Sequence, residues 1–275
     1  MIAANVAAAR FLQRQKMPGL YRIHEGPTED RLNKLRAFLG ELGLGLGGGD
    51  QPSPVDYTRL LERVRDRPDT HLIQTVMLRS LAQAIYSPGN VGHFGLALDA
   101  YAHFTSPIRR YPDLLVHRAI RHAINGGKPV DFFHPHAELV GLGEHCSMTE
   151  RRADEAVRDA VEWLKCEFML DKVGQVFEGI ITAVTAFGLF VELRGVFVEG
   201  LVHVTSLRND YYHFDPVGHR LHGERSGQVY RLGDRLTVRV ARVDLDERKI
   251  DFEPVENEHR ERGQRNRYLR RRRAE

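Results

Sequence analysis

Apolar residues recur at helical spacing through most of the first 170 residues of the chain. Leu32, Leu35 and Leu39 form one such stripe, because positions three and four apart share a helix face. Residues 21–24 read as a brief extended segment between the first two helical patterns. We therefore expect α-helices over the ranges 1–15, 28–42, 56–64, 70–86, 105–124 and 147–170.

Residues 92–104 depart from this helical pattern. Apolar or small residues occupy every second position from Phe94 to Phe104, which predicts a strand buried on at least one face. Thr105 follows as a candidate N-cap, and Pro107 as a residue suited to the first helical position. The pattern thus predicts a buried strand that passes directly into the start of a helix.

Two arginines, Arg109 and Arg110, lie in the first turn of that predicted helix. Free backbone N–H groups and the positive end of the helix dipole favour an anion there. Guanidinium groups bind phosphate through paired hydrogen bonds, so we expect a phosphate site. An alternative is that the arginines pair with local carboxylates such as Asp99 or Asp113. Further candidate ligands for RNA or phosphate are Tyr101, His103, Thr105 and Ser106.

The periodicity changes at Gly174 from helical to alternating. Alternating segments cover residues 174–184, 187–193, 198–204, 235–244 and 248–252. Five short strands in a compact segment predict a small closed barrel. Phe187 and Phe190 then have two interpretations, as barrel core or as a platform on which bases stack.

Composition is that of an ordinary water-soluble chain, with 42% hydrophobic and 28% charged residues among 275. The net charge of +3 is uneven, because residues 257–275 hold eight arginines against three glutamates, a balance of +5. Residues 255–275 are expected to be a disordered Arg-rich tail that binds RNA, or alternatively a solubilising tail. The two cysteines, Cys146 and Cys166, favour a reducing, cytoplasmic location, and we expect no membrane contact.

Residues 92–118 closely resemble the segment HFGLALxxYxHFTSPIRRYPDLxxHR of the catalytic RNB domain in the ribonuclease II and R family. In that family the first arginine after Ser-Pro-Ile contacts the scissile phosphate, which implies a catalytic role for Arg109. The resemblance implies that residues 1–172 are the C-terminal portion of an RNB domain. The helix at Met1 would then be internal, so we expect the chain to be the C-terminal part of a longer enzyme.

Residues 173–254 closely resemble the S1-type RNA-binding domain, an OB-fold, and the overall class is therefore expected to be α+β. The resemblance rests on the pattern G-x-V-x-x-G-x-I followed by F-G-x-F-V and E-G-L-V-H-V-T. It implies an RNA-binding surface formed by Phe187, Phe190, His203, Asp244 and Arg248.

The two resemblances together imply a hydrolytic 3′-to-5′ exoribonuclease that degrades RNA processively to nucleoside 5′-monophosphates with Mg²⁺ as cofactor. They imply single-stranded RNA, and also structured RNA, as partners, with ribosome association through the tail, no DNA binding and a monomeric state. The family holds its metal with a cluster of closely spaced aspartates, and this sequence contains no such cluster. The 275 residues alone are therefore expected to be inactive. The alternatives are a non-catalytic RNA-binding module and an adaptor on ribosomes or messenger RNA.

Overall fold

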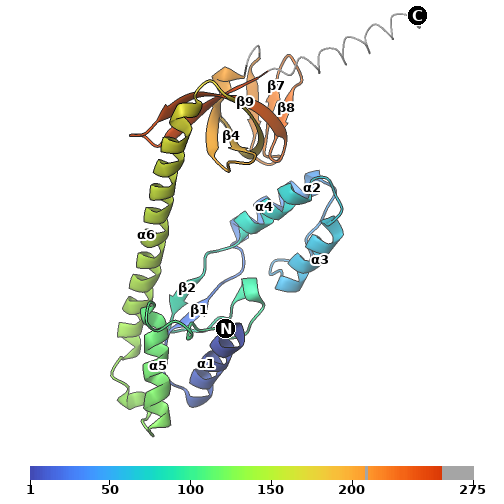
Figure 1. Cartoon of the computed structure of the whole chain (residues 1–275). Coiled ribbons are helices and arrows are strands. Elements are labelled where there is room, and N and C mark those ends of the chain that lie inside the picture. Colours follow the sequence, from blue (N-terminus) through green and yellow to red (C-terminus); the bar gives the residue numbers. More distant parts are fainter. Residues whose placement is uncertain (208–209, 256–275) are drawn as a thin grey trace, which may run out of the picture. The chain divides into compact units, whose positions relative to one another are not determined.

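Helices dominate the first part of the computed structural model and short strands the second (Figure 1). The structure describes residues 1–207 and 210–255. The chain divides into two compact units, Met1–Val157 and Arg158–Glu275. No helix within the described ranges is long and apolar enough to cross a membrane. The predicted Arg-rich tail, apart from Val255, lies outside the described residues.

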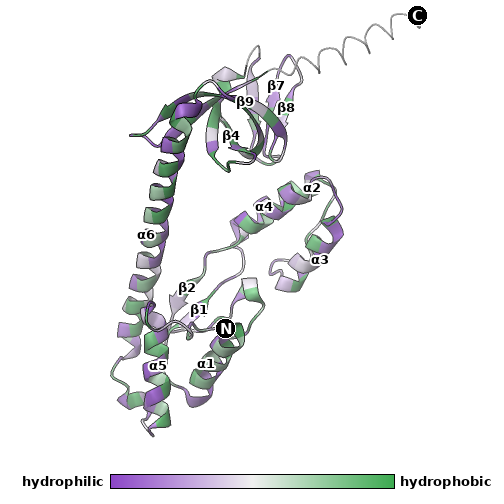
Figure 2. Ribbon diagram, viewed as in Figure 1, coloured by the Kyte–Doolittle hydropathy of each residue, from purple (hydrophilic) through white to green (hydrophobic). Residues whose placement is uncertain are grey.

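Each predicted helical segment corresponds to an α-helix, although several boundaries differ from those expected. The α-helices of the described ranges are α1 (Ile2–Gln15), α2 (Glu29–Glu41), α3 (Pro54–Val64), α4 (Thr70–Ser80), α5 (Tyr111–Ile124) and α6 (His136–Met169). Short 3₁₀ turns cover Phe94–Leu96, Pro129–Asp131, Leu170–Lys172 and Val204–Ser206. Figure 2 shows that each helix carries both hydrophobic and hydrophilic residues, as expected for helices with one face in a core.

Two boundaries changed because local polar groups find better partners than the predicted ones. Helix α3 starts at Pro54 rather than at Asp56, since Ser53 and Asp56 form a reciprocal capping box. Helix α4 ends at Ser80 rather than continuing to residue 86. The following segment forms β2 (Ile85–Ser87), which pairs antiparallel with β1 (Tyr21–Ile23) and satisfies the backbone groups of that strand.

The predicted start of the long helix at Ser147 was also wrong. Helix α6 begins at His136, and Ser147 lies inside it as a buried residue. The Ser147 hydroxyl donates to the carbonyl oxygen of Gly143 and accepts a hydrogen bond from the backbone N–H of Tyr86. Its side chain therefore connects α6 to β2 instead of capping a helix.

The predicted strand over residues 92–104 is absent from the structure. Phe94–Leu96 form a 3₁₀ turn that ends at Ala97 with a φ of 52°, and the chain then runs in irregular conformation to the start of α5. Ala100 and Ala102 are buried against α1 and α5. The alternation is one of residue type and not of burial, since Ala100, Tyr101 and Ala102 are buried in succession.

Two main apolar clusters stabilise the first unit. One joins α1, β1 and α5 around Leu12, Ile23 and Val116, which are nearly or fully buried. The other joins α2, α3 and α4 around Leu39 and Ile73. Each fully buried leucine or isoleucine contributes about 1.5–3 kcal/mol of transfer free energy, so these stripes hold the helices in place.

The predicted five-stranded barrel is confirmed. Its strands are β3 (Val176–Thr185), β4 (Gly188–Leu193), β5 (Glu199–His203), β9 (Arg235–Asp244) and β10 (Lys249–Pro254), closed in the order β10-β5-β4-β3-β9. Gly188 is required at the β3–β4 turn, since its φ is 157° and a Cβ there would lie 2.3 Å from the Val202 carbonyl oxygen. That close approach brings the ends of β4 and β5 together.

A three-stranded antiparallel sheet between β5 and β9 was not predicted. It consists of β6 (Tyr212–Asp215), β7 (Arg220–Gly223) and β8 (Val229–Arg231), in the order β6-β7-β8. These strands are only three or four residues long. Polar side chains occupy most of their outward positions, so the sequence alone resembles a loop.

Candidate functional site

One buried carboxylate fixes the turn of residues 105–110 that precedes α5. Asp113 lies in the first turn of α5 and is fully buried. Its Oδ1 atom accepts hydrogen bonds from the Ser106 N–H and from Nη2 of Arg110, each at 2.8 Å. The charge also lies where the positive end of the α5 dipole stabilises it. Asp113 therefore holds both ends of the turn.

Neither arginine of this turn lies inside the helix, contrary to the sequence-based expectation. Arg110 is the N-cap residue of α5, and Pro112 rather than Pro107 occupies the first helical turn. Residues 106–110 form a separate turn, in which the N–H of Arg110 donates to the Ser106 carbonyl oxygen. The anion that the helix start favours is the side chain of Asp113 itself.

The two guanidinium groups differ in their availability to a ligand. Arg110 has only 24% of its side chain exposed and is ion-paired with Asp113, which confirms the local-carboxylate alternative for this residue. Arg109 is exposed, and its side chain has no ion pair or hydrogen bond within the described part of the chain. Arg109 is therefore the guanidinium of the turn that is free to bind an anion.

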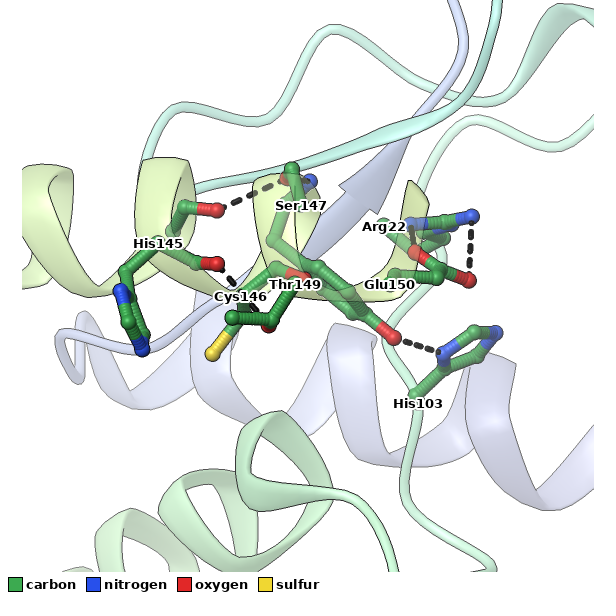
Figure 3. A network of polar contacts seen from close by, with 9 residues as sticks. Arg22, His103, His145, Cys146, Ser147, Thr149 and Glu150 are labelled. Carbon is green, nitrogen blue, oxygen red and sulfur yellow. Dashed lines mark hydrogen bonds and ion pairs between the residues drawn. The ribbon is translucent and has the colours of Figure 1, made fainter. Parts of the chain in front are cut away.

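A polar network lies between β1, β2 and α6 and includes the predicted ligand His103 (Figure 3). Arg22 donates two hydrogen bonds to the Glu150 carboxylate, at 2.6 and 3.0 Å. The Arg22 guanidinium carbon also lies 4.6 Å from the centre of the Tyr86 ring. The Tyr86 hydroxyl is 2.9 Å from Nδ1 of His103. Bidentate and cation–π contacts together orient these side chains.

The protonation states in this network follow from burial. Burial is the main cause that raises the pKa of Tyr86 to about 12, with a further contribution from Glu150. Burial, together with the nearby Arg110 and Arg22, lowers the pKa of His103 to about 4. At neutral pH both side chains are therefore uncharged, and the Tyr86 hydroxyl and Nδ1 of His103 share a hydrogen bond. His103 therefore brings no positive charge to this network.

Tyr101, a second predicted ligand, is buried and already hydrogen-bonded. Its hydroxyl accepts a hydrogen bond from Nδ2 of Asn5 at 2.9 Å, and Oδ1 of Asn5 accepts one from the Phe104 N–H at 3.1 Å. These bonds connect α1 to the segment that leads into the turn. Thr105 and Ser106 are half-buried, and Ser106 contributes its backbone N–H to Asp113.

The low pKa of two histidines predicts acid sensitivity of the first unit. Burial, and then the neighbouring His24, lowers the pKa of His93 to about 4, like that of His103. Between pH 6.5 and 4 the unfolded chain binds protons that the folded chain does not, so stability falls as pH falls. We expect the free energy of unfolding of residues 1–157 to drop by about 2–4 kcal/mol from pH 7 to pH 5, because each of the two histidines contributes up to about 2 kcal/mol.

Hydrogen exchange of the amides in α1 and α5 measures this loss for the first unit alone. A His103→Gln variant should show a shallower pH dependence, because the titrating group is gone. An unchanged slope in that variant would show that His103 does not titrate abnormally.

On the barrel, three of the predicted RNA-binding side chains lie close together. Phe187 is 49% exposed, and Phe190 is partly exposed. Their ring centres are 6.0 Å apart at an angle of 87°. His203 is exposed at the end of β5, directly opposite Gly188, and its Nδ1 is 2.7 Å from the Thr205 hydroxyl. This placement excludes Phe187 from the barrel core.

The other two predicted RNA ligands lie together at the turn between β9 and β10. Asp244 accepts from Arg242 at 2.5 Å and from the Glu247 N–H at 3.0 Å, and these bonds, that to Glu247 foremost, lower its pKa. Arg248 is ion-paired with Asp159 of α6 at 2.9 Å. No contact among the described residues joins this pair to Phe187, Phe190 or His203.

The described residues do not fit a magnesium site. They contain no group of three or more His, Cys, Asp or Glu side chains that could hold a metal ion. Asp113, the carboxylate beside the arginines, is buried and bonded to an N–H and a guanidinium. His134, two positions before His136, contacts Glu138 at 2.9 Å. Mg²⁺ prefers an octahedral set of oxygen ligands and bound water, which these contacts do not provide.

Sequence reasoning missed four residues that organise the site, namely Asn5, Arg22, Tyr86 and Glu150. Each contacts a partner at least 17 positions away in the chain, so local sequence patterns could not predict these contacts. Asp113 was considered only as a partner of the arginines. An acidic residue at the third helical position could have indicated its capping role.

Comparison with known proteins gives two adjacent domain matches. Residues 1–126 match the RNB domain, and residues 170–253 match the S1 RNA binding domain. Ribonuclease R of Escherichia coli (strain K12) is 57% identical over 266 residues, which cover 94% of this chain and 33% of that protein. Ribonuclease R of Vibrio cholerae is 54% identical over 273 residues, covering 96% and 33%. The chain thus spans about one third of the length of these relatives.

A solved structure leads to the same family. The apo form of Mycoplasma genitalium RNase R matches with a TM-score of 0.84 and 27% identity, covering 93% of this chain and 40% of that one. The expected order, an RNB segment followed by an S1 barrel, is therefore found in both sequence and structure. The chain therefore carries an RNB segment followed by an S1 barrel and is similar to ribonuclease R over most of its own length.

Proposed function

We propose that this chain forms part of a hydrolytic 3′-to-5′ exoribonuclease of the ribonuclease R type, in which Arg109 contacts the scissile phosphate. The observation that carries the proposal is the exposed Arg109 on a turn fixed by the buried Asp113. A free guanidinium on a rigid turn can stabilise charge that develops on a transferring phosphoryl group. It needs no reorganisation at the moment of reaction.

Other residues of the unit position that arginine. Arg110 serves the turn rather than the substrate, because it is committed to Asp113. In this proposal Nε2 of His103 donates to an RNA oxygen, in the tautomer whose Nδ1 accepts from the Tyr86 hydroxyl 2.9 Å away. Asn5 and Tyr101 anchor the preceding segment to α1. In this proposal Tyr101, Thr105 and Ser106 act through position rather than through charge.

We propose that hydrolysis also requires a divalent cation, Mg²⁺, held by an aspartate cluster of the longer enzyme that these 275 residues do not contain. A bound metal generates hydroxide at neutral pH, which an arginine cannot do. Residues 1–275 would then supply the phosphate contact and the RNA-binding surface, with the cytoplasm as the proposed location. Single-stranded RNA is the proposed substrate, with structured RNA as a second one and ribosome contact through the tail.

The second candidate function is RNA binding without catalysis. It is favoured by the lack of a carboxylate cluster in the described ranges. A chimaera in which residues 1–275 replace the matching segment of Escherichia coli ribonuclease R separates the two candidates, as 57% identity makes the exchange practicable. Nucleoside 5′-monophosphate release from the 3′ end of RNA by the chimaera supports the enzyme. A folded chimaera without that activity favours the binding module.

RNA binding by the barrel is expected to depend on aromatic stacking. A Phe187→Ala and Phe190→Ala double variant of the 275-residue chain should bind a single-stranded RNA oligonucleotide at least about tenfold more weakly, because each stacked base contributes about 1–3 kcal/mol. The loss should be similar at every salt concentration, since stacking is not screened. Fluorescence anisotropy from 50 to 300 mM salt measures both quantities. Binding equal to that of the parent chain would refute the stacking assignment.

A further inference from the structure

The sheet β6-β7-β8 has one apolar and one polar face. Leu221 is fully buried in its middle strand, and the Tyr212 and Tyr230 rings meet 5.7 Å apart beside it. Strand β3 of the barrel lies against β7 and β8. Since side chains alternate between faces along a strand, the neighbours of Leu221 point the other way. The sheet therefore covers the barrel with one face and exposes the other.

The exposed face carries cationic and imidazole side chains around an open groove of about 370 Å³. Cross-strand pairs bring His213 opposite His222 and Arg220 opposite Arg231. Six of the groove-lining residues lie on alternate positions of the three strands, namely His213, Asp215, Arg220, His222, Val229 and Arg231. Like charges placed opposite each other destabilise a strand pair, so the Arg220–Arg231 pair calls for an explanation.

The charges of this face are not balanced internally. Asp215, the acid of the groove, is satisfied by Arg220 at 2.7 Å and by the N–H groups of Val217 and Gly218. Arg231 is exposed, and its guanidinium has no ion pair or hydrogen bond among the described residues. The His213 imidazole faces the Glu224 carboxylate at 3.6 Å. The groove therefore keeps one uncompensated positive charge, that of Arg231, and the imidazole of His222.

An aromatic side chain flanks the charged groove. Tyr211 is 67% exposed, and its ring centre lies 4.9 Å from that of His213. Asp210 fixes the turn of residues 224–226, because its carboxylate accepts hydrogen bonds from the N–H groups of Arg225 and Ser226. Exposed aromatic rings beside basic groups are the combination that single-stranded nucleic acids use, with bases on the rings and phosphates on the cations.

We propose that the polar face of β6-β7-β8 is a second contact surface for single-stranded RNA, separate from Phe187, Phe190 and His203. Arg231 and His222 bind backbone phosphates, and Tyr211 stacks a base. The inference rests on the proposed RNA-binding function. It extends the path of one bound RNA from the barrel surface to this sheet. A strand long enough to reach both surfaces should therefore bind more tightly than a short one.

The test compares two oligonucleotides, a short and a long single-stranded RNA of about 5 and 15 nucleotides, on the 275-residue chain. A Tyr211→Ala and Arg231→Gln double variant should weaken binding of the long RNA about tenfold and lower its log–log salt slope by about 0.7, the value for one phosphate contact. Binding of the short RNA should stay within about twofold of the parent, since the barrel surface is intact. Both positions are exposed, so the melting temperature should not change.

Arg194→Gln is the matched control, because it removes the same charge from an exposed arginine on the β4–β5 connection. A loss of long-RNA affinity equal to that of the double variant would overturn the proposal, as it would reflect net charge alone. Parent-like binding by the Tyr211→Ala and Arg231→Gln variant, alongside weakened binding by the Phe187→Ala and Phe190→Ala variant, would also overturn it. That result leaves the proposed function standing, whereas failure of the parent chain to bind either RNA would refute both.

Discussion

Replacing Arg109 by lysine in the chimaera is expected to lower the turnover of single-stranded RNA about 100- to 1000-fold, the usual cost of losing one oriented donor to a transition-state oxyanion. Lysine keeps the positive charge but loses the planar fork that contacts two phosphate oxygens. RNA affinity should stay within about twofold, because stacking and other phosphate contacts dominate binding. Single-turnover kinetics with saturating enzyme measures the chemical step, and anisotropy measures affinity.

Arg110→Lys is the matched control for this prediction. Arg110 is ion-paired with Asp113, and a lysine can keep that contact. Its turnover should fall less than about tenfold, which is well below the loss from Arg109→Lys. Equal effects of the two substitutions would contradict the assignment of the scissile phosphate to Arg109.

Replacing Asp113 by alanine is expected to give the largest loss of stability in the first unit, about 3–5 kcal/mol. The carboxylate is fully buried and bonded to the Ser106 N–H and to Arg110. Its removal leaves a largely buried guanidinium and a backbone donor without partners, which costs far more than the pair contributes. Hydrogen exchange over residues 100–124 reports the loss without interference from the barrel.

The Arg110→Met and Asp113→Leu double variant separates desolvation from packing. With both charges replaced by apolar groups, stability should recover by at least about 2 kcal/mol relative to Asp113→Ala. Nuclease activity should stay low in the corresponding chimaera, since Ser106 is no longer held. A loss below about 1 kcal/mol for Asp113→Ala would show that the turn is fixed by other contacts.

The barrel could be predicted from the sequence because its strands alternate cleanly and its turns carry glycines. Val191 and Val202 are fully buried in the barrel, whereas the residue before each of them, Phe190 and Leu201, is partly exposed. The same reasoning failed at residues 92–104. Ala100, Tyr101 and Ala102 are buried one after another there, and residues 92–104 form no strand of a sheet. Alternation of residue types therefore does not by itself establish alternating burial or strand pairing.

The candidate site was predictable only in its residue types. The exposed Arg109 and the aromatic pair on the barrel were found from motifs. The commitment of Arg110 to Asp113, and of Tyr101 to Asn5, depends on contacts made across the fold. Short strands with polar outer faces, such as β6 and β8, were also not predicted, because three or four residues are too few to show a periodic pattern.

The most direct test of the account is the release of nucleoside 5′-monophosphates from 5′-labelled single-stranded RNA in the presence of magnesium. The chimaera carrying residues 1–275 should shorten the RNA stepwise from its 3′ end, and its Arg109→Lys variant should do so about 100- to 1000-fold more slowly. The 275-residue chain by itself should bind the same RNA and release no nucleotide. Magnesium-dependent nucleotide release by the purified 275-residue chain, or an inactive but folded chimaera, would contradict the account.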